Sequence, residues 1–411
     1  MDKEAVDILV IGAGASGLLA AGVAASRGKS VVLIERNREA GRKLRIAGKG
    51  RCNLTNDTDV RGLEANIPGN PKFLRTAFYH FTPRDVIAFF TARGVPCKTE
   101  RGERVFPVSD QAGDVVQALL DYCAQHGVRY RLQTTVTHLL RDDAGGIRGV
   151  QTATGVEVPA AAVVVATGGA SYPGTGSHGD GYRLAREVGH TIIPIQPSLV
   201  PLVTEESWPV DVQGLSLRNV TLTASSPAGK TLYRELGEML FTHYGVSGPL
   251  VLTASRYIGT VPGSKMEIDL KPGLDVAALD ARLLRDFDAQ HRKHLINALD
   301  ELLPASLIPL IVTLSEIPAH TPVFQIIREQ RLRLVHLLKH LPLTVKKARP
   351  LAEAIVTTGG VSTAEIDPRT MQSKLVPGLY FTGEVIDVDG FTGGFNLQIA
   401  WSTGHLAGES V

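Results

Sequence analysis

Three glycines near the N-terminus are spaced as a dinucleotide-binding turn requires. Gly12, Gly14 and Gly17 directly follow a short, mostly apolar run at 7–11 and open a segment with helical spacing. In this pattern the first glycine permits a tight turn, the second lets the backbone approach a pyrophosphate, and the third lets helix and strand pack closely. The amide groups and dipole at the helix N-terminus favour the phosphates. The predicted cofactor contacts in this turn are Gly12, Ala13, Gly14, Ala15, Ser16 and Gly17.

An acidic residue at the end of the next predicted strand completes the pattern. Glu35 ends the strand at 30–36, where a carboxylate accepts hydrogen bonds from an adenosine ribose. Arg36 follows it and is predicted to contact the same cofactor. The alternative is a glycine-rich turn with only a structural role. A second copy of the glycine pattern, at 174–179, follows no strand and leads to no acidic strand end, so we interpret it as a flexible loop near the cofactor.

The elements that must position these residues alternate between strands and helices. The strands at 7–11 and 30–36 flank a predicted helix at 15–28, and helices at 83–94 and 112–127 each end near a glycine. Successive strands follow and close with a buried, Val-rich run. This order predicts an α/β domain with a largely parallel, buried sheet.

The second half of the chain has a different texture. Thr-rich and Val-rich segments from about residue 191 predict an antiparallel sheet or barrel, and a block with helical spacing follows it. A buried strand at 378–384 and a final helix at 396–411 then resemble the N-terminal part again, so the middle is predicted to be inserted. The fold class is α/β, with a discontinuous Rossmann-like domain. The predicted domains are 1–190 with 355–411 for dinucleotide binding, 191–273 with 342–354 for the β-rich insert, and 274–341 for the helical insert.

Composition narrows the class of protein. The chain has 411 residues, a formal net charge of +2, 44% hydrophobic residues and 6% aromatic residues, as expected of a globular protein with two or three domains. Cys52, Cys97 and Cys123 match neither a metal-site spacing nor a disulfide framework, which predicts free thiols and a cytoplasmic location. The sequence contains no signal-peptide pattern and no apolar stretch of membrane-spanning length.

Two later segments resemble flavoproteins of the two-dinucleotide-fold type. VVVATGG at 163–169 is similar to their second strand-to-turn signature, and GLYFTGEVID at 378–387 is similar to their late strand ending in Gly-Glu. In such proteins the late strand runs under the ribityl chain of FAD, and the next helix directs its positive dipole end toward the flavin. The resemblance implies further FAD contacts at Val136, Ala166, Thr167, Gly168, Gly383, Glu384, Gly394, Asn396 and Leu397.

A more specific resemblance covers essentially the whole chain. The segments GRCNLTN, FTHYGVSGP, TTGGVSTAEIDPRTMQSK and GLYFTGEVIDVDGFTGGFNLQIAWSTGHLAG, in this order, resemble the BaiN/YhiN-type flavoproteins, also called aminoacetone oxidase family FAD-binding enzymes. This resemblance implies an FAD-dependent oxidoreductase. It also implies a discontinuous FAD domain that contains an inserted β-rich domain, which in turn contains a helical domain.

The basic segment GRKLRIAGKGRCNLTN at 41–56 then becomes a second part of the cofactor site. By analogy with related flavoproteins, Gly48 and Gly50 permit close approach of the backbone to FAD, while Arg42 and Lys43 neutralise phosphate. Cys52 would lie near the reactive ring. The alternative for a single cysteine is a small buried hydrophobic residue.

Reduction of a conjugated C=C bond needs a proton donor beside the hydride donor. A positioned thiol, imidazole or phenol can serve, and the candidates are Cys52 first, then His243 and Tyr172, with His178 weaker still. Each of the others is more readily explained as structural. No Ser/His/Asp order, metal-ligand cluster or phosphate-binding GK[ST] motif points to hydrolysis or kinase chemistry. NAD(P)H is predicted to visit the flavin transiently as the reductant, because the sequence shows no second nucleotide domain.

The resemblance leaves three functions open. The leading one is reduction of uridine to dihydrouridine in 23S ribosomal RNA; the second is small-molecule chemistry, either reduction of unsaturated 3-oxo steroids or oxidation of amino ketones; the third is a flavin-bearing binding protein without turnover. A basic strip could contact RNA phosphates, although a solvated helix face explains it equally well. The strip consists of Arg328, Arg331, Arg333, Lys339, Lys346, Lys347 and Arg349, with Glu329 as its one acid.

Overall fold

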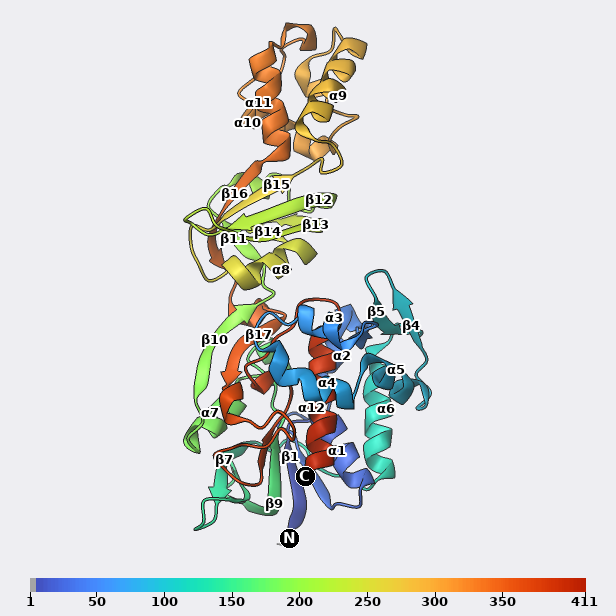
Figure 1. Ribbon diagram of the computed structural model, residues 1–411, viewed down its shortest axis with the longest axis vertical. Helices are drawn as coiled ribbons and strands as arrows, with labels where there is room; N and C mark the ends of the chain where they lie inside the picture. The colour runs from blue at the N-terminus through green and yellow to red at the C-terminus, as the bar shows by residue number, and fades with distance from the viewer. Residues whose placement is uncertain (1–4) are drawn as a thin grey trace. The chain divides into compact units, whose positions relative to one another are not determined.

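The computed structural model describes residues 5–411 and divides them into two compact units (Figure 1). The first unit contains the described residues up to Gln196 together with Ala354–Val411, and the second contains Pro197–Glu353. The first is therefore discontinuous in sequence. The further division of the second unit into β-rich and helical domains stays a prediction. Among the described residues, no helix has the length and apolarity needed to cross a bilayer.

The first unit is built on a mostly parallel sheet. Strand β1 lies between β2 and β9, in parallel with both, and β18 continues the parallel set beside β9. Antiparallel strands β8 and β7 extend the other part of β9, so the order is β6-β2-β1-β9-β8-β7. The sheet strands are β1 Val6–Ile11, β2 Val31–Ile34, β6 Arg129–Arg131, β7 Val136–Arg141, β8 Ile147–Thr152, β9 Glu157–Val165 and β18 Leu379–Phe381. The predicted Rossmann-like α/β class is confirmed.

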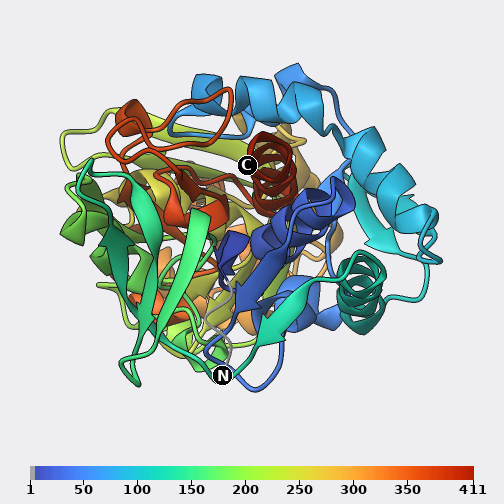
Figure 2. The ribbon, with the colours of Figure 1, turned by 90° about the horizontal axis from the view of Figure 1, so that it is seen from below.

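Helices and two small sheets cover this unit. The helices are α1 Ala15–Ser26, α2 Arg42–Ile46, α3 Val60–Ala65, α4 Arg75–His80, α5 Pro83–Thr91, α6 Ala112–Gln125, α7 Asp180–Glu187 and α12 Phe395–Ser410. The smaller strands are β3 Thr55–Asn56, β4 Cys97–Glu100 and β5 Arg104–Pro107 in one sheet, and β10 Ile192–Ser198 with β17 Val356–Val361 in the other. Helices α1 and α12 lie side by side (Figure 2). Their close approach requires Gly404, because a Cβ atom there would lie 2.5 Å from the Ser16 carbonyl oxygen.

The second unit is a closed barrel with helices inserted between its later strands. Its six strands, in the order β11-β14-β13-β12-β15-β16, realise the predicted antiparallel sheet or barrel. They are β11 Leu202–Thr204, β12 Ser216–Ser225, β13 Thr231–Thr242, β14 Gly245–Ser247, β15 Lys265–Asp269 and β16 Leu341–Ala348. The helices are α8 Pro249–Ile258, α9 Val276–Ala289, α10 Ile308–Leu314 and α11 Arg328–Lys339.

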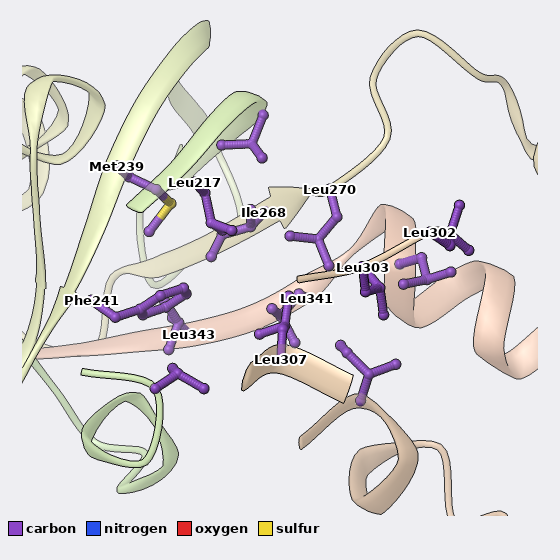
Figure 3. Packing of buried hydrophobic residues seen from close by; sticks show 14 of the residues in the cluster. Leu217, Met239, Phe241, Ile268, Leu270, Leu302, Leu303, Leu307, Leu341 and Leu343 are labelled. Carbon is purple, nitrogen blue, oxygen red and sulfur yellow. The ribbon is translucent and has the colours of Figure 1, made fainter. Parts of the chain in front are cut away.

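One hydrophobic core runs through this second unit. Phe241 and Met239 of the barrel, Leu341 and Leu343 of β16, and Leu307 next to α10 belong to a single buried cluster (Figure 3). The barrel strands alternate buried and exposed positions, as in β12, because successive side chains point to opposite faces. The buried side chains of the helices between β15 and β16 therefore pack in the same core as those of the barrel.

Candidate cofactor site

The glycine turn has the geometry that the sequence predicts. Gly12 has a φ of 104°, and an added Cβ would lie 2.5 Å from the Ala166 carbonyl oxygen. At Gly17 a Cβ would lie 1.9 Å from the Gly12 oxygen, so neither position tolerates a side chain. A Cβ on Gly14 would instead meet nothing within 4 Å. Gly14 is also the N-cap of α1 and has no side chain to cap the first amides. This open, uncapped helix start fits a pyrophosphate.

Glu35 is buried directly beside this turn. Its Oε2 accepts a hydrogen bond of 2.8 Å from the Ala13 amide, and its Oε1 accepts bonds of 2.8 and 2.7 Å from the backbone and side-chain nitrogens of Asn37. A carboxylate has about four acceptor sites, so these bonds fix the group and leave capacity for ribose hydroxyls. Asn37 does not belong to the predicted set, and its signal in the sequence is an amide two residues after the acidic strand end.

The second glycine pattern lies against this end of β2. The Asn37 side chain donates to the Thr175 carbonyl at 3.0 Å, and Arg36 forms an ion pair with Asp180 at the start of α7. Arg36 also donates to the Gly176 carbonyl at 3.5 Å. Arg36 and Asn37 thus hold the loop at 173–179 next to Glu35, and the charge of Arg36 is balanced by a protein carboxylate.

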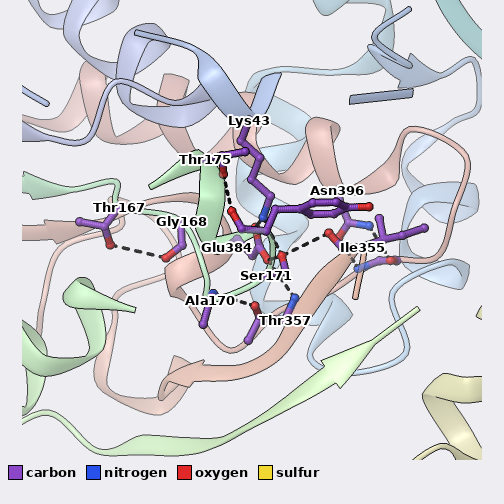
Figure 4. A network of polar contacts seen from close by, with 12 residues as sticks. Lys43, Thr167, Gly168, Ala170, Ser171, Thr175, Ile355, Thr357, Glu384 and Asn396 are labelled. Carbon is purple, nitrogen blue, oxygen red and sulfur yellow. Dashed lines mark hydrogen bonds and ion pairs between the residues drawn. The ribbon is translucent and has the colours of Figure 1, made fainter. Parts of the chain in front are cut away.

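A polar network joins four segments of the first unit that are distant in sequence (Figure 4). Lys43 donates to Glu384 Oε2 and to Ser171 Oγ, each at 2.8 Å. Glu384 Oε1 accepts from the Thr357 amide at 2.8 Å and from Ser171 Oγ at 3.2 Å. Burial alone would raise the pKa of the Glu384 carboxyl, but the charge of Lys43 and these hydrogen bonds hold that pKa below its ordinary value. Lys43 therefore has an anionic partner within the protein, whereas Arg42 makes a bond of 3.1 Å to Asn37.

The glycine-rich loop after α2 has unusual backbone geometry. Gly48, Lys49, Gly50 and Cys52 all have φ between 58° and 84°, a left-handed region that non-glycine residues rarely adopt. Arg51 fixes the loop: its guanidinium donates to Glu100 at 2.5 Å and to Asp110 at 2.6 Å, and lies 4.1 Å from the centre of the Phe106 ring.

The Cys52 side chain points into the core of the first unit. It is fully buried and belongs to the same hydrophobic cluster as Leu54 and Trp401. Burial raises the pKa of the Cys52 thiol far above its ordinary value, so its proton stays on Sγ. These observations support the packing interpretation of Cys52.

The segment at 53–56 is anchored to the last helix. Trp401 donates to the Leu54 carbonyl at 2.9 Å, and Thr55 Oγ1 contacts Gln398 Oε1 at 2.5 Å. Gly394, the N-cap of α12, has a φ of 103° and lies so close to Thr55 that a Cβ would clash with its carbonyl. The first turn of α12 is thereby held beside the segment that follows the glycine-rich loop.

The other predicted FAD contacts lie elsewhere in the first unit. Asn396 bonds back to Gly390 at 2.9 and 2.6 Å, so its amide orders its own loop. Val136 is buried at the start of β7, and its carbonyl accepts from Arg183 at 3.3 Å. The remaining members of the predicted set in this unit lie at the ends of β9 and β18 or at the start of α12; they are Ala166, Thr167, Gly168, Gly383 and Leu397.

The candidate proton donors fall into different environments. Tyr172 follows Ser171 of the polar network, is 37% exposed, and has a φ of 52°. A bulky residue in this region is strained, and such strain concentrates at functional sites. His178 is exposed in the neighbouring loop. His243 lies in the turn between β13 and β14 of the second unit, where it is exposed and contacts the Tyr244 ring.

A buried serine–histidine–glutamate relay, which the sequence did not reveal, lies elsewhere in the first unit. His190 Nδ1 is 3.2 Å from Glu365 Oε2, and its Nε2 is 2.8 Å from Ser373 Oγ. The His190 side chain is completely buried, so the arrangement anchors the segment at 362–376 and gives no substrate access to the serine. Burial lowers the pKa of His190 despite the nearby Glu365.

The basic strip is split between two elements and is largely neutralised. Residues 328–339 form α11, and most of the rest lie on β16. Ion pairs join Arg331 to Asp280, Arg333 to Glu316, Lys339 to Asp269, Lys346 to Glu205, and Arg349 to Glu353. Arg328 and Lys347 form no ion pair within residues 5–411. The strip is therefore not a continuous free cationic face.

Known proteins resemble this chain over its whole length. The family described as "HI0933-like protein Rossmann domain" matches residues 6–410. The chain is 34% identical to the ribosomal RNA dihydrouridine synthase of Escherichia coli, over 99% of this chain and 98% of that protein. It is also 34% identical to the 3-dehydro-bile acid delta(4,6)-reductase of Clostridium scindens, over 98% of each. The fold resembles the 3-ketosteroid delta1-dehydrogenase of Sterolibacterium denitrificans, with a TM-score of 0.52, 14% identity, and coverage of 98% of this chain and 99% of that chain.

Proposed function

Because the chain belongs to the HI0933-like family of FAD-dependent oxidoreductases, we propose that it saturates a uridine C=C bond in 23S ribosomal RNA to give dihydrouridine, with NAD(P)H as reductant. The observation that carries this proposal is the full-length similarity to the ribosomal RNA dihydrouridine synthase of Escherichia coli. Since the family members are enzymes, a binding protein without turnover is no longer a candidate. We also infer a cytoplasmic location, because Cys52, Cys97 and Cys123 are all free thiols.

The residues of the first unit would hold FAD along the edge of the parallel sheet. The first turn of α1 would accept the pyrophosphate, and Glu35 the adenosine ribose. Glu384, oriented by Lys43 and Thr357, lies at the end of β18 and offers a fixed carboxylate. The positive end of α12 would favour negative charge on a reduced ring. FAD supplies the hydride chemistry, and the chain supplies orientation and electrostatics.

Tyr172 is the proton donor that we propose. The phenol is exposed, so a substrate can reach it, and its neighbour Ser171 belongs to the Lys43–Glu384 network. Cys52 also carries a proton, but its burial places Sγ away from solvent. His243 stays a candidate in the second unit. The strained backbone of Tyr172 and its exposure together favour it over the other two.

A small unsaturated ketone is the second candidate substrate. The equal identity to a bile acid reductase supports it, and the same hydride and proton transfers would serve a steroid enone. An amino ketone oxidase would instead reduce oxygen. Anaerobic addition of NADPH should bleach the flavin for either reductase, whereas bleaching by an amino ketone with hydrogen peroxide release in air would indicate the oxidase.

The decisive experiment maps dihydrouridine in 23S ribosomal RNA. Deletion of the gene should abolish one dihydrouridine, and purified FAD-loaded protein with NADPH should restore it in RNA from the deletion strain. Unchanged modification in that strain would contradict the proposal. A parallel assay with an unsaturated 3-oxo steroid separates the second candidate.

A further inference from the structure

Two exposed chain segments of the second unit lie side by side next to α9 and α11. The Leu295 amide donates to the Thr321 carbonyl at 2.9 Å, and the Val323 amide donates to the Lys293 carbonyl at 3.0 Å. Buried Leu295 and Val323 anchor the two segments from below. We call residues 291–296 and 319–328 the loop pair.

Aromatic rings lie on the exposed side of the loop pair. The rings of His291 and Phe324 stack with their centres 4.9 Å apart and an interplanar angle of 7°. His294 and His320 form a second, edge-on contact at 5.4 Å. Phe324 is 53% exposed and Ile327 57% exposed, although large apolar side chains are usually buried. The loop pair therefore exposes several aromatic rings and an apolar side chain to solvent.

Positive charge accompanies these rings. Arg292 and Arg328 are exposed and form no ion pair within residues 5–411, while Lys293 makes only a long contact of 3.7 Å with Asp300. The nearest acids along the chain are Asp288 and Glu329, and neither forms an ion pair with these arginines. The loop pair thus keeps free cations that most of the basic strip lacks.

We propose that the loop pair docks single-stranded RNA. Aromatic faces that stack on bases, combined with cations for the phosphates, are the features by which proteins bind single strands. Exposed rings beside two free arginines suit an unpaired RNA loop better than a duplex, whose bases are not available for stacking. The inference rests on the proposed function and adds to it the surface that recognises the RNA outside the reacting nucleotide.

Binding of a fluorescent, uridine-rich single-stranded RNA to the full-length, FAD-loaded protein tests this inference. Phe324→Ala should weaken binding about tenfold, because one stacked base is lost, whereas Phe324→Trp should retain it. Arg328→Gln should weaken binding several-fold and reduce the slope of log affinity against log salt by roughly 0.7. The matched controls are Tyr79→Ala and Arg84→Gln, both exposed residues of the first unit, which should leave affinity unchanged.

Four outcomes decide between the alternatives. Wild-type RNA affinity in Phe324→Ala would overturn the docking surface. If light scattering showed that Phe324→Ala changes the molecular mass of the protein without changing its RNA affinity, the loop pair would be an interface between proteins, and the proposal would also be overturned. Dihydrouridine formation is measured separately. If wild type binds RNA through Phe324 but forms no dihydrouridine, the docking surface stands and the proposed function fails. If dihydrouridine forms and Phe324→Ala binds normally, the function stands and the docking surface fails.

Discussion

The two basic segments of this chain, 41–56 and 328–349, are similarly rich in Lys and Arg but have different roles. In the first, Lys43 and Arg51 pair with acids from distant parts of the first unit and so build the polar network and the glycine-rich loop. In the second, Arg331 and Lys339 pair with Asp280 and Asp269 and tie α11 to α9 and β15. The difference teaches that cation density in a sequence does not measure free positive charge, because acids brought close by the fold decide it.

The largest effect should follow from removing the contacts of Lys339 in the second segment. Lys339 is almost buried and donates to Asp269 at 2.6 Å and to the carbonyls of Lys271 and Leu274. Lys339→Met leaves a carboxylate and two carbonyls without their donor, and should lower the free energy of unfolding by about 3 kcal/mol. Urea denaturation measures this. FAD affinity should not change, and a change in it would contradict the separation of roles.

The next effect concerns the chemistry assigned to the first unit. Tyr172→Phe removes the proposed proton donor and keeps the ring, so dihydrouridine formation should fall about a hundredfold. Single-turnover kinetics with pre-reduced enzyme measures it, while the rate of flavin bleaching by NADPH should be unchanged. Cys52→Ala serves as the comparison and should retain turnover with some loss of stability. If Cys52→Ala lost dihydrouridine formation and Tyr172→Phe kept it, Cys52 would be the proton donor.

A smaller effect is expected from breaking the network of the first segment. Lys43→Met leaves Glu384 without its cationic partner and should weaken FAD binding about tenfold. Titration of the apoprotein by flavin fluorescence gives the affinity. Arg45→Gln, an exposed neighbour on α2, should behave as wild type. Equal affinities for Lys43→Met and wild type would show that the ion pair only stabilises the fold.

The smallest effect is a dependence of stability on pH that belongs to the first unit. Burial lowers the pKa of His190 and also that of His405, so the unfolded chain takes up protons first as the pH falls. Stability should therefore decrease from about pH 6.5 downward and stay level above it. Urea midpoints between pH 7.5 and 5.5 measure the slope. His190→Gln should flatten it in part, and an unaltered slope would exclude His190 as a source.

Local patterns are enough to predict the elements of the candidate cofactor site. The predicted strand at 7–11 corresponds to β1, the helix after Gly14 corresponds to α1, and the final helix begins one residue before the predicted start. These signals are short in range: a buried strand, a glycine turn and an acidic strand end. The sequence also left a sheet or a barrel open, because strand alternation does not reveal closure.

Long-range pairing could not be predicted in the same way. Ser171 and Thr357 belong to no motif, and they become neighbours of Glu384 only through the fold. The contacts of His190 could not be predicted for the same reason, since its partners lie 175 and 183 residues away in the sequence. The neutralisation of the basic strip could not be predicted either, because the acids that pair with it lie on five separate segments of the second unit.

The contact between Thr55 and Gln398 spans 343 residues, and the whole second unit is encoded between them. A ribosome that adds about 5–20 residues per second therefore needs on the order of tens of seconds to supply α12 after residue 55 has emerged. During this interval the segment at 53–56 lacks its contacts with α12. The second unit, whose core is continuous in sequence, can fold in the meantime. Assembly of the candidate cofactor site is thus a late event in the synthesis of this protein.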